Sequence, residues 1–173
     1  MKKSDLPNLP PFFDRYILLA NDEDVVTALE NSAGLFENEA VKQKLIALGD
    51  QVYAEGKWTA KDIVQHIIDT ERIMAYRALR ISRNDKTPLP GFDEEFFAQH
   101  TTAATRTLPE LLAEFKLVRQ SSVLLFESMN AEMLQREGIS SNQPITALAL
   151  GFVLVGHPIH HLNVLQERYF GLL

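Results

Sequence analysis

The stretch from Thr59 to Thr87 contains neither glycine nor proline, and this constrains the fold more than any other feature of the sequence. Thr59 is followed three residues later by Asp62, a spacing that resembles a capping box, in which two side chains satisfy free backbone N–H groups at a helix start. Because nothing interrupts the backbone until Pro88, we predict one helix from Thr59 to about Arg83. A helix of that length needs partners for its apolar side.

Capping residues and apolar periodicity indicate further helices along the chain. They are expected from Asp22 as N-cap to about Gly34, over residues 37–48, over residues 108–129, briefly after Asn130, and from Pro144 to about Phe170. No stretch alternates apolar and polar residues over a convincing strand length, and there is no internal repeat. The pattern predicts an all-α fold, a four-helix bundle with short extra helices and a long cross-connection over residues 84–107.

The segment that precedes these helices, residues 1–21, is expected to act as a docking arm. It contains three prolines, which disfavour a long helix, and three aromatic residues that can pack onto the core. A chain of 173 residues has the usual length of one domain, so we predict a single helical-bundle domain over residues 1–173.

The composition excludes several classes of function. Without cysteine the chain has no disulfide framework, thiolate metal site or cysteine nucleophile, so His, Asp or Glu must hold any metal. A net charge of −6 with scattered Lys and Arg argues against nucleic acid and anionic membranes as partners. The longest apolar stretch, residues 145–156, is shorter than a bilayer span, and no export signal is evident. We therefore expect a cytoplasmic protein with a small-molecule substrate.

Three of the five histidines are expected to face the bundle interior. His157 and His161 are four residues apart, so they lie one above the other on the apolar face of the last helix. His66 lies on the flank of the apolar stripe of the Thr59 helix. Buried polar groups need partners, and a shared cation would satisfy these rings together. The alternative is that each is a core histidine with its own hydrogen bond, and the pattern alone leaves both possibilities open.

Pro158 and the two remaining histidines give less information about the site. His157 and His161 have the spacing of an HExxH zinc protease, but Pro158 occupies the position of the catalytic glutamate, so that class is excluded. Pro158 is also expected to bend the helix locally. His160 is expected to be exposed, with a supporting role beside the site as the alternative, and His100 is expected on the surface.

Three charged residues near the predicted site are considered for supporting roles. Asp69 is a candidate to orient a histidine ring as an outer carboxylate, whereas Glu71 is expected to be a solvated helix charge. Arg77 shares the inner face about 16 Å further along the helix, by the rise per residue. It is a candidate contact for an anionic substrate, and an ion pair with a neighbouring helix is the simpler expectation.

Two blocks of the sequence resemble the DinB-like (DinB/YfiT-like) superfamily of metalloenzymes. They are GKWTAKDIVQHIIDTERIMAYRALRISRNDKTPLPGF and ALGFVLVGHPIHHLNVLQERYF. The resemblance covers nearly the whole chain and is weaker over the first fifty or so residues. It implies a bundle of up-down-down-up type and a divalent metal held by His66, His157 and His161. Pro158 departs from the Glu or Ser expected in close relatives, which affects the local helix geometry rather than the ligands.

The resemblance also implies candidate activities. The family includes thiol-dependent S-transferases and isomerases, beside members described as metal-dependent hydrolases, and a homodimer is implied as well. The catalytic group itself stays unknown, because no general base is evident beside His66. This slightly favours a thiol S-transferase that acts on small electrophiles with a low-molecular-weight thiol as cosubstrate. Alternatives are a hydrolase that activates water, and a non-catalytic metal-binding or interaction bundle. Zn, Ni and Fe all suit a site of three imidazoles.

Overall fold

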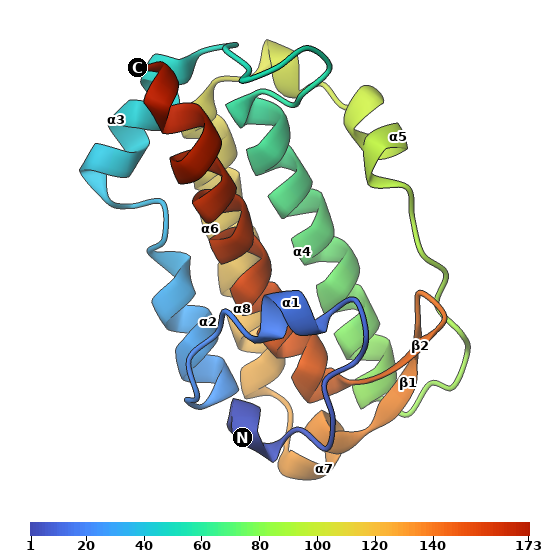
Figure 1. Ribbon diagram of the computed structural model, residues 1–173. Coiled ribbons are helices and arrows are strands. Elements are labelled where there is room, and N and C mark those ends of the chain that lie inside the picture. Colours follow the sequence, from blue (N-terminus) through green and yellow to red (C-terminus); the bar gives the residue numbers. More distant parts are fainter.

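The computed structural model describes all 173 residues and shows a four-helix bundle, as predicted. Three of its positions are filled by the long helices α4 (Ala60–Ser82), α6 (Leu108–Glu127) and α8 (Ala147–Val164). The fourth is shared by two shorter helices, α2 (Val25–Ala33) and α3 (Glu39–Leu48), which follow one another along the side of the bundle (Figure 1). The helix pairs α4–α8 and α4–α6 form the most extensive contacts.

Local capping explains where most helices begin. Thr59 and Asp62 form the predicted capping box of α4, and Thr107 with Glu110 forms a second one at α6. Asn130 caps α7 (Ala131–Gln135), also as predicted. The cap of α2 is Asp24 rather than Asp22, because the Asp24 carboxylate accepts from the Val26 N–H at 3.0 Å.

The prediction that Pro144 opens the last helix is wrong. Residues Glu137–Ser140 (β1) and Gln143–Thr146 (β2) form an antiparallel hairpin, and α8 begins only after it, with Thr146 as N-cap. Ser141 and Asn142 both have positive φ, the backbone twist that joins two strands through a two-residue turn. The strands are too short for alternation to reveal them in the sequence.

The long connection after α4 is more structured than expected. Leu89 joins the hairpin, since its N–H donates to the Ile139 carbonyl at 2.9 Å and its own carbonyl accepts from Ser141. The chain then forms α5 (Glu94–Gln99) and a 3-10 turn at Ala103–Thr105. In Figure 1 this whole segment runs along the outer side of α4, which brings α5 beside it.

The N-terminal arm lies across α8. It contains a 3-10 turn at Lys3–Asp5 and the short helix α1 (Asp14–Ile17), which contacts α8 (Figure 1). Gly156 permits this contact, because a Cβ atom at this position would lie 1.9 Å from the Tyr16 carbonyl oxygen. The arm is therefore packed directly on the backbone of α8.

The apolar core consists of two clusters. One contains Met74 of α4 and Val155 of α8, and the other contains Ile63 of α4 and Leu162 of α8. His66 and His157 lie between these positions on their helices, so a polar layer interrupts the core. This layer holds the candidate site.

Helix α8 is the most apolar part of the chain. The π-helical turn Leu165–Tyr169 and the 3-10 turn Phe170–Leu172 continue α8. By length and composition alone, the combined segment Ala147–Leu172 is long and apolar enough to cross a membrane. Its most apolar window has a mean hydropathy of 1.4, but 72% of that window is buried among the other helices. This is the environment of a core helix.

Candidate metal centre

The structure brings together the three histidines that the sequence predicted to face the interior. The Nε2 atom of His66 lies 3.0 Å from that of His157, and the Nε2 atom of His161 lies 3.1 Å from the same atom. All three donor atoms lie within 4.8 Å of one another. α4 supplies one ring and α8 supplies two, so the site depends on the packing of these two helices.

Burial keeps the three rings neutral at physiological pH. It lowers the pKa of His66 to about 4, with a smaller effect from the nearby His160. It lowers the pKa of His161 to about 2, to which His66 and His160 also contribute. The pKa of His157 lies well below its usual value, through burial first and then through the charges of its neighbours. Neutral imidazoles keep lone pairs free for a metal.

The donor set fits a divalent metal better than a set of ordinary hydrogen bonds. A neutral imidazole has one N–H and one acceptor nitrogen, so the single Nε2 of His157 is a poor partner for two other Nε2 atoms at once. A cation placed among the three atoms would be bound by a lone pair from each. Nε2 atoms 3.0 and 3.1 Å apart are close enough that His66, His157 and His161 could hold one cation together.

Aromatic rings enclose the cluster on two sides. The Trp58 ring packs on His66, with centroids 4.9 Å apart, and the Tyr16 ring of the arm packs edge-on against His157 at 5.2 Å. Burial raises the pKa of the Tyr16 hydroxyl. Neither aromatic residue was predicted to belong to the site, since both are distant from the histidines along the chain.

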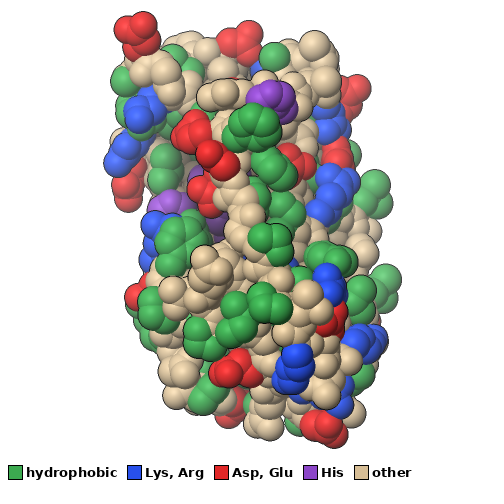
Figure 2. Space-filling view, turned by 90° about the vertical axis from the view of Figure 1, so that its right-hand side faces the viewer, with side chains coloured by type: hydrophobic (Ala, Val, Ile, Leu, Met, Phe, Trp, Pro, Cys, Tyr) green, Lys and Arg blue, Asp and Glu red, His purple; other side chains and the backbone are tan.

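A small cavity of about 160 Å³ reaches the cluster at His161. Glu95 of α5 lines the same cavity, and its carboxylate accepts a hydrogen bond from the Trp58 indole N–H at 3.1 Å. The other wall residues are Tyr53, Gly56, Lys57, Trp58, Ile63, Val164 and Tyr169. Figure 2 views the molecule from the right-hand side of Figure 1 and shows histidine side chains inside a recess, with acidic side chains beside them. Glu95 was not predicted to belong to the site, because α5, which places it here, lies in the long connection after α4.

Glu71 follows His66 on α4, and the expectation that it is solvated is wrong. Its carboxylate is 2% exposed and accepts from Arg119 of α6 at 2.7 Å. Arg119 also donates to the Leu154 carbonyl at 2.7 Å and to the Ser32 hydroxyl. Arg119 is close enough to His157 to contribute to its lowered pKa. A buried ion pair therefore adjoins the histidines.

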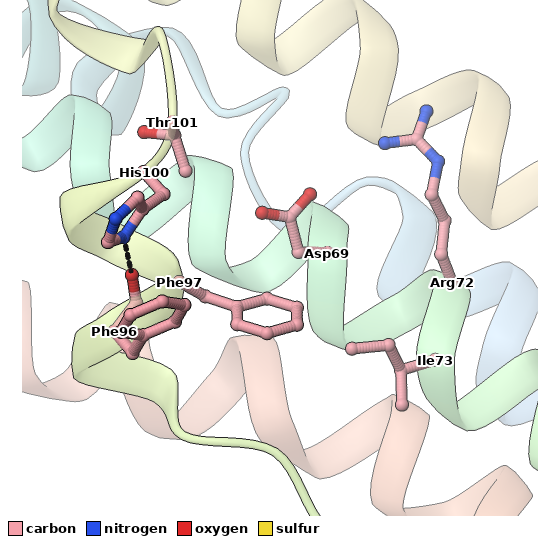
Figure 3. A pocket seen from close by; sticks show the side chains of 7 residues that line it. All are labelled: Asp69, Arg72, Ile73, Phe96, Phe97, His100 and Thr101. Atoms are coloured by element: carbon pink, nitrogen blue, oxygen red, sulfur yellow. Dashed lines mark hydrogen bonds between the residues drawn. The ribbon is translucent and has the colours of Figure 1, made fainter.

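Asp69 does not orient a histidine ring in this structure. Its carboxylate accepts from the Gln65 side chain at 2.9 Å, and burial raises its pKa. It faces a separate cavity of about 410 Å³ between α4 and α5. Figure 3 shows Asp69 pointing into this space opposite Phe97, while Arg72 extends away from it.

The two remaining histidines differ in their surroundings. His100 is exposed, as predicted, and its Nδ1 donates to the Phe96 carbonyl at 2.7 Å (Figure 3). His160 is half-buried rather than exposed, because its ring packs against Tyr16 at 5.4 Å and against His161 at 5.1 Å. Pro158 lies inside α8 and is buried, and the helix continues past it.

Arg77 does not form the ion pair that was the simpler expectation. It is 2% exposed, yet no ion pair of the structure includes it. Its guanidinium donates to the Pro90 carbonyl at 2.7 Å and contacts the Met74 sulfur at 3.4 Å. It lies outside the cavity that reaches the histidines.

Comparison with known proteins agrees with the fold. A family model described as DinB superfamily matches residues 46–165, which include all three clustered histidines. The structure of YfiT from Bacillus subtilis, described as a probable metal-dependent hydrolase with an unusual four-helix bundle topology, is similar with a TM-score of 0.66. The two share 18% sequence identity over 92% of this chain and 87% of YfiT, a likeness of fold. No curated protein is significantly similar to the chain.

Proposed function

The chain belongs to the DinB superfamily, and on that basis we propose that it is a divalent-metal-dependent enzyme that acts on a small-molecule substrate. The observation that carries the proposal is the convergence of three buried Nε2 atoms from His66, His157 and His161. Their lowered pKa values leave them unprotonated near neutral pH, so protons do not compete with a cation.

His66, His157 and His161 would hold the metal, which supplies Lewis acidity to a ligand that enters through the cavity at His161. With only three protein ligands, a bound metal would keep a position for that ligand, as in catalytic rather than structural zinc sites. Trp58 and Tyr16 pack against His66 and His157 and so cover part of the cluster. The hydrogen bond from Trp58 fixes Glu95 at the wall of the cavity.

Hydrolysis is the reaction that this arrangement favours. A hydrolase needs a group that removes a proton from the attacking water, and Glu95 lines the same cavity as His161. Its carboxylate is held by Trp58, so it is positioned for that role. The description of YfiT as a probable metal-dependent hydrolase is consistent with this choice.

Thiol transfer is the second candidate, and the wall of the cavity supports it. Its side chains are mainly apolar, with Lys57 as a cation, a combination suited to an apolar electrophile and an anionic thiol. In this reaction the sulfur of a low-molecular-weight thiol attacks the electrophile, its proton passes to Glu95, and the leaving group departs with the bonding electrons. A cytoplasmic location, where such thiols stay reduced, belongs to this proposal.

Metal content tests the proposal directly. Protein purified without a nickel column is expected to contain about one equivalent of a divalent transition metal, and His157→Ala is expected to lose it. His100→Ala is the matched control, because His100 is exposed and lies outside the cluster, and it should keep the metal. Less than about half an equivalent, unchanged by His157→Ala, would contradict the proposal.

Activity assays separate the two reactions. Hydrolysis of 4-nitrophenyl acetate and conjugation of monochlorobimane with several cellular thiols should be measured on the metal-loaded protein. Glu95→Gln is expected to slow hydrolysis by roughly 100-fold or more at unchanged metal content. Conjugation without hydrolysis would favour thiol transfer, and neither reaction at full metal content would favour a non-catalytic metal-binding bundle.

A further inference from the structure

A third cavity, separate from those at His161 and Asp69, lies between the N-terminal arm, α4 and the hairpin turn. Its volume is about 420 Å³, and Arg77 of α4 is one of its walls. Phe12 and Phe13 of the arm form another wall, and Ser141 of the turn a third. We call it the Arg77 cavity. It is large enough for a molecule the size of a substituted benzene ring.

Arg77 is a buried cation without a compensating anion. The side chain is 2% exposed, and its only protein contacts for hydrogen bonding are the Pro90 carbonyl and the Met74 sulfur. A guanidinium has five N–H groups, so most of its donor capacity is unused by the protein. Burial lowers the pKa of Arg77, but an arginine stays protonated in proteins. A bound anion would offset the cost of burying this charge.

The rest of the Arg77 cavity is suited to an apolar body that carries a few polar groups. Phe12, Phe13, Met74 and Phe92 supply apolar surface, while the Ser141 hydroxyl and the Gln143 amide supply hydrogen-bonding groups. The Phe92 ring also lies under the guanidinium, with its centroid 5.8 Å from Arg77 Cζ. Apolar and polar groups share the wall about equally, a lining suited to a small organic ligand that has both an apolar body and a polar group.

Glu94 restricts the charge of that ligand. It lines the exposed edge of the Arg77 cavity and does not pair with Arg77. A carboxylate there repels a second negative charge, so a polyanion is disfavoured relative to a ligand with one anionic group.

From this arrangement we infer that the Arg77 cavity binds a small monocarboxylate with an aromatic or similarly apolar body. The ligand carboxylate accepts hydrogen bonds from the free N–H groups of Arg77, and the apolar body packs against Phe12, Phe13 and Phe92. The site is independent of the proposed metal chemistry, because neither Arg77 nor the arm phenylalanines belong to the histidine cluster.

The experiment compares 3-phenylpropionate with its neutral amide, 3-phenylpropionamide, by titration calorimetry on protein kept metal-free with a chelator. The carboxylate is expected to bind at least about tenfold more tightly than the amide, since only the carboxylate uses the charge of Arg77. Arg77→Met should remove this difference. Arg72→Gln is the matched control, because Arg72 lies on the same helix outside the Arg77 cavity, and it should keep the difference.

A second variant tests the inference without changing Arg77. Glu94→Gln is expected to tighten carboxylate binding severalfold and to leave amide binding unchanged, because it removes a repelling charge. Equal affinity for acid and amide in the unmodified protein would overturn the inference. So would a preference that survives in folded Arg77→Met, one that disappears in Arg72→Gln, or no response to Glu94→Gln. None of these outcomes depends on the metal proposal, since no metal is present in the experiment.

Discussion

Arg119 and Arg77 are both almost fully buried, but only one of them has its charge compensated within the fold. Arg119 pairs with Glu71 at 2.7 Å and reaches the Leu154 carbonyl as well. Arg77 has one carbonyl and one sulfur as partners and lies at the wall of a cavity of about 420 Å³. The two guanidiniums have similar exposure and different surroundings.

The difference indicates different roles for two chemically identical groups. Burial of a charge is unfavourable unless an opposite charge lies close by, so Arg119 and Glu71 depend on each other for their place in the core. The charge of Arg77 is available to a ligand, because no acidic side chain forms an ion pair with it. Burial alone therefore does not distinguish an arginine that stabilises the fold from one that binds a ligand. The distinction depends on whether an acidic side chain pairs with the guanidinium.

The largest expected effect is the loss of stability when the ion pair between Arg119 and Glu71 is broken. Arg119→Met is expected to lower the free energy of unfolding by about 3–5 kcal/mol, because it leaves the Glu71 carboxylate buried without a partner. Arg77→Met should lower the free energy of unfolding by no more than about 1 kcal/mol, because the loss of one hydrogen bond is offset by removal of an uncompensated buried charge. Urea denaturation monitored by circular dichroism measures both values.

A double variant serves as the control for this prediction. Arg119→Met combined with Glu71→Leu should be more stable than Arg119→Met alone, because no unpaired charge remains. Similar losses in Arg119→Met and Arg77→Met would remove the distinction between the two arginines.

An intermediate effect is expected where the arm meets α8. Gly156→Ala places a Cβ atom 1.9 Å from the Tyr16 carbonyl oxygen, and neither backbone can yield without moving the arm. We expect a loss of roughly 1–3 kcal/mol. Affinity for 3-phenylpropionate should fall as well, because Phe12 and Phe13 of the arm line the Arg77 cavity. Denaturation and calorimetry measure the two effects.

Gly171→Ala is the control for steric crowding. A Cβ atom at this position would have no other atom within 4 Å, so the stability of this variant should not change appreciably. Unchanged carboxylate affinity in Gly156→Ala, at reduced stability, would show that the arm does not contribute to the cavity.

The smallest expected effect is the pH dependence of stability that comes from the buried histidines of the cluster. Burial lowers the pKa of His66 to about 4, whereas an unfolded histidine titrates near 6.5. The unfolded state therefore takes up more protons as the pH falls from 7 toward 4, and metal-free protein loses stability over that range. Between pH 7 and pH 6 the loss is expected to be about 0.7 kcal/mol for each such histidine.

Denaturation of chelated protein at several pH values measures this slope. His66→Gln should make it shallower, and His100→Gln should not, because His100 is exposed. A slope that is the same in all three proteins would contradict the assignment of neutral buried rings to the cluster.

Much of the fold follows from local features of the sequence. The capping box at Thr59 and the stretch without glycine or proline that follows it predicted α4 nearly to the residue. The helix predicted over residues 108–129 matches α6, which spans Leu108–Glu127. The resemblance to the DinB-like superfamily is confirmed by the family match over residues 46–165. The hairpin before α8 escaped prediction, because its strands of four residues are stabilised by pairing with each other and with Leu89.

The candidate site was predictable in part for the same reason. The i, i+4 spacing of His157 and His161 places both rings on one side of a helix, and this can be derived from residue numbers alone. Their approach to His66, with 3.0 Å between the Nε2 atoms of His66 and His157, depends on the packing of α4 against α8. Helix periodicity left this approach as one of two possibilities, and the family resemblance favoured it. Glu95, Trp58 and Tyr16 join from segments that have no local signal for such a role.

The sequence by itself determined where the long helices α4 and α6 lie, which faces of the long helices are apolar, and which three histidines point inward. These properties depend on neighbours within a few residues, where backbone geometry fixes the spacing. Only the tertiary structure decided that Glu71 neutralises Arg119, that Arg77 has no such partner, and that Glu95 reaches the histidine cavity. Compensation of charge depends on distances between residues far apart in the chain, 48 positions for Glu71 and Arg119, and such distances are set by how the helices and loops pack.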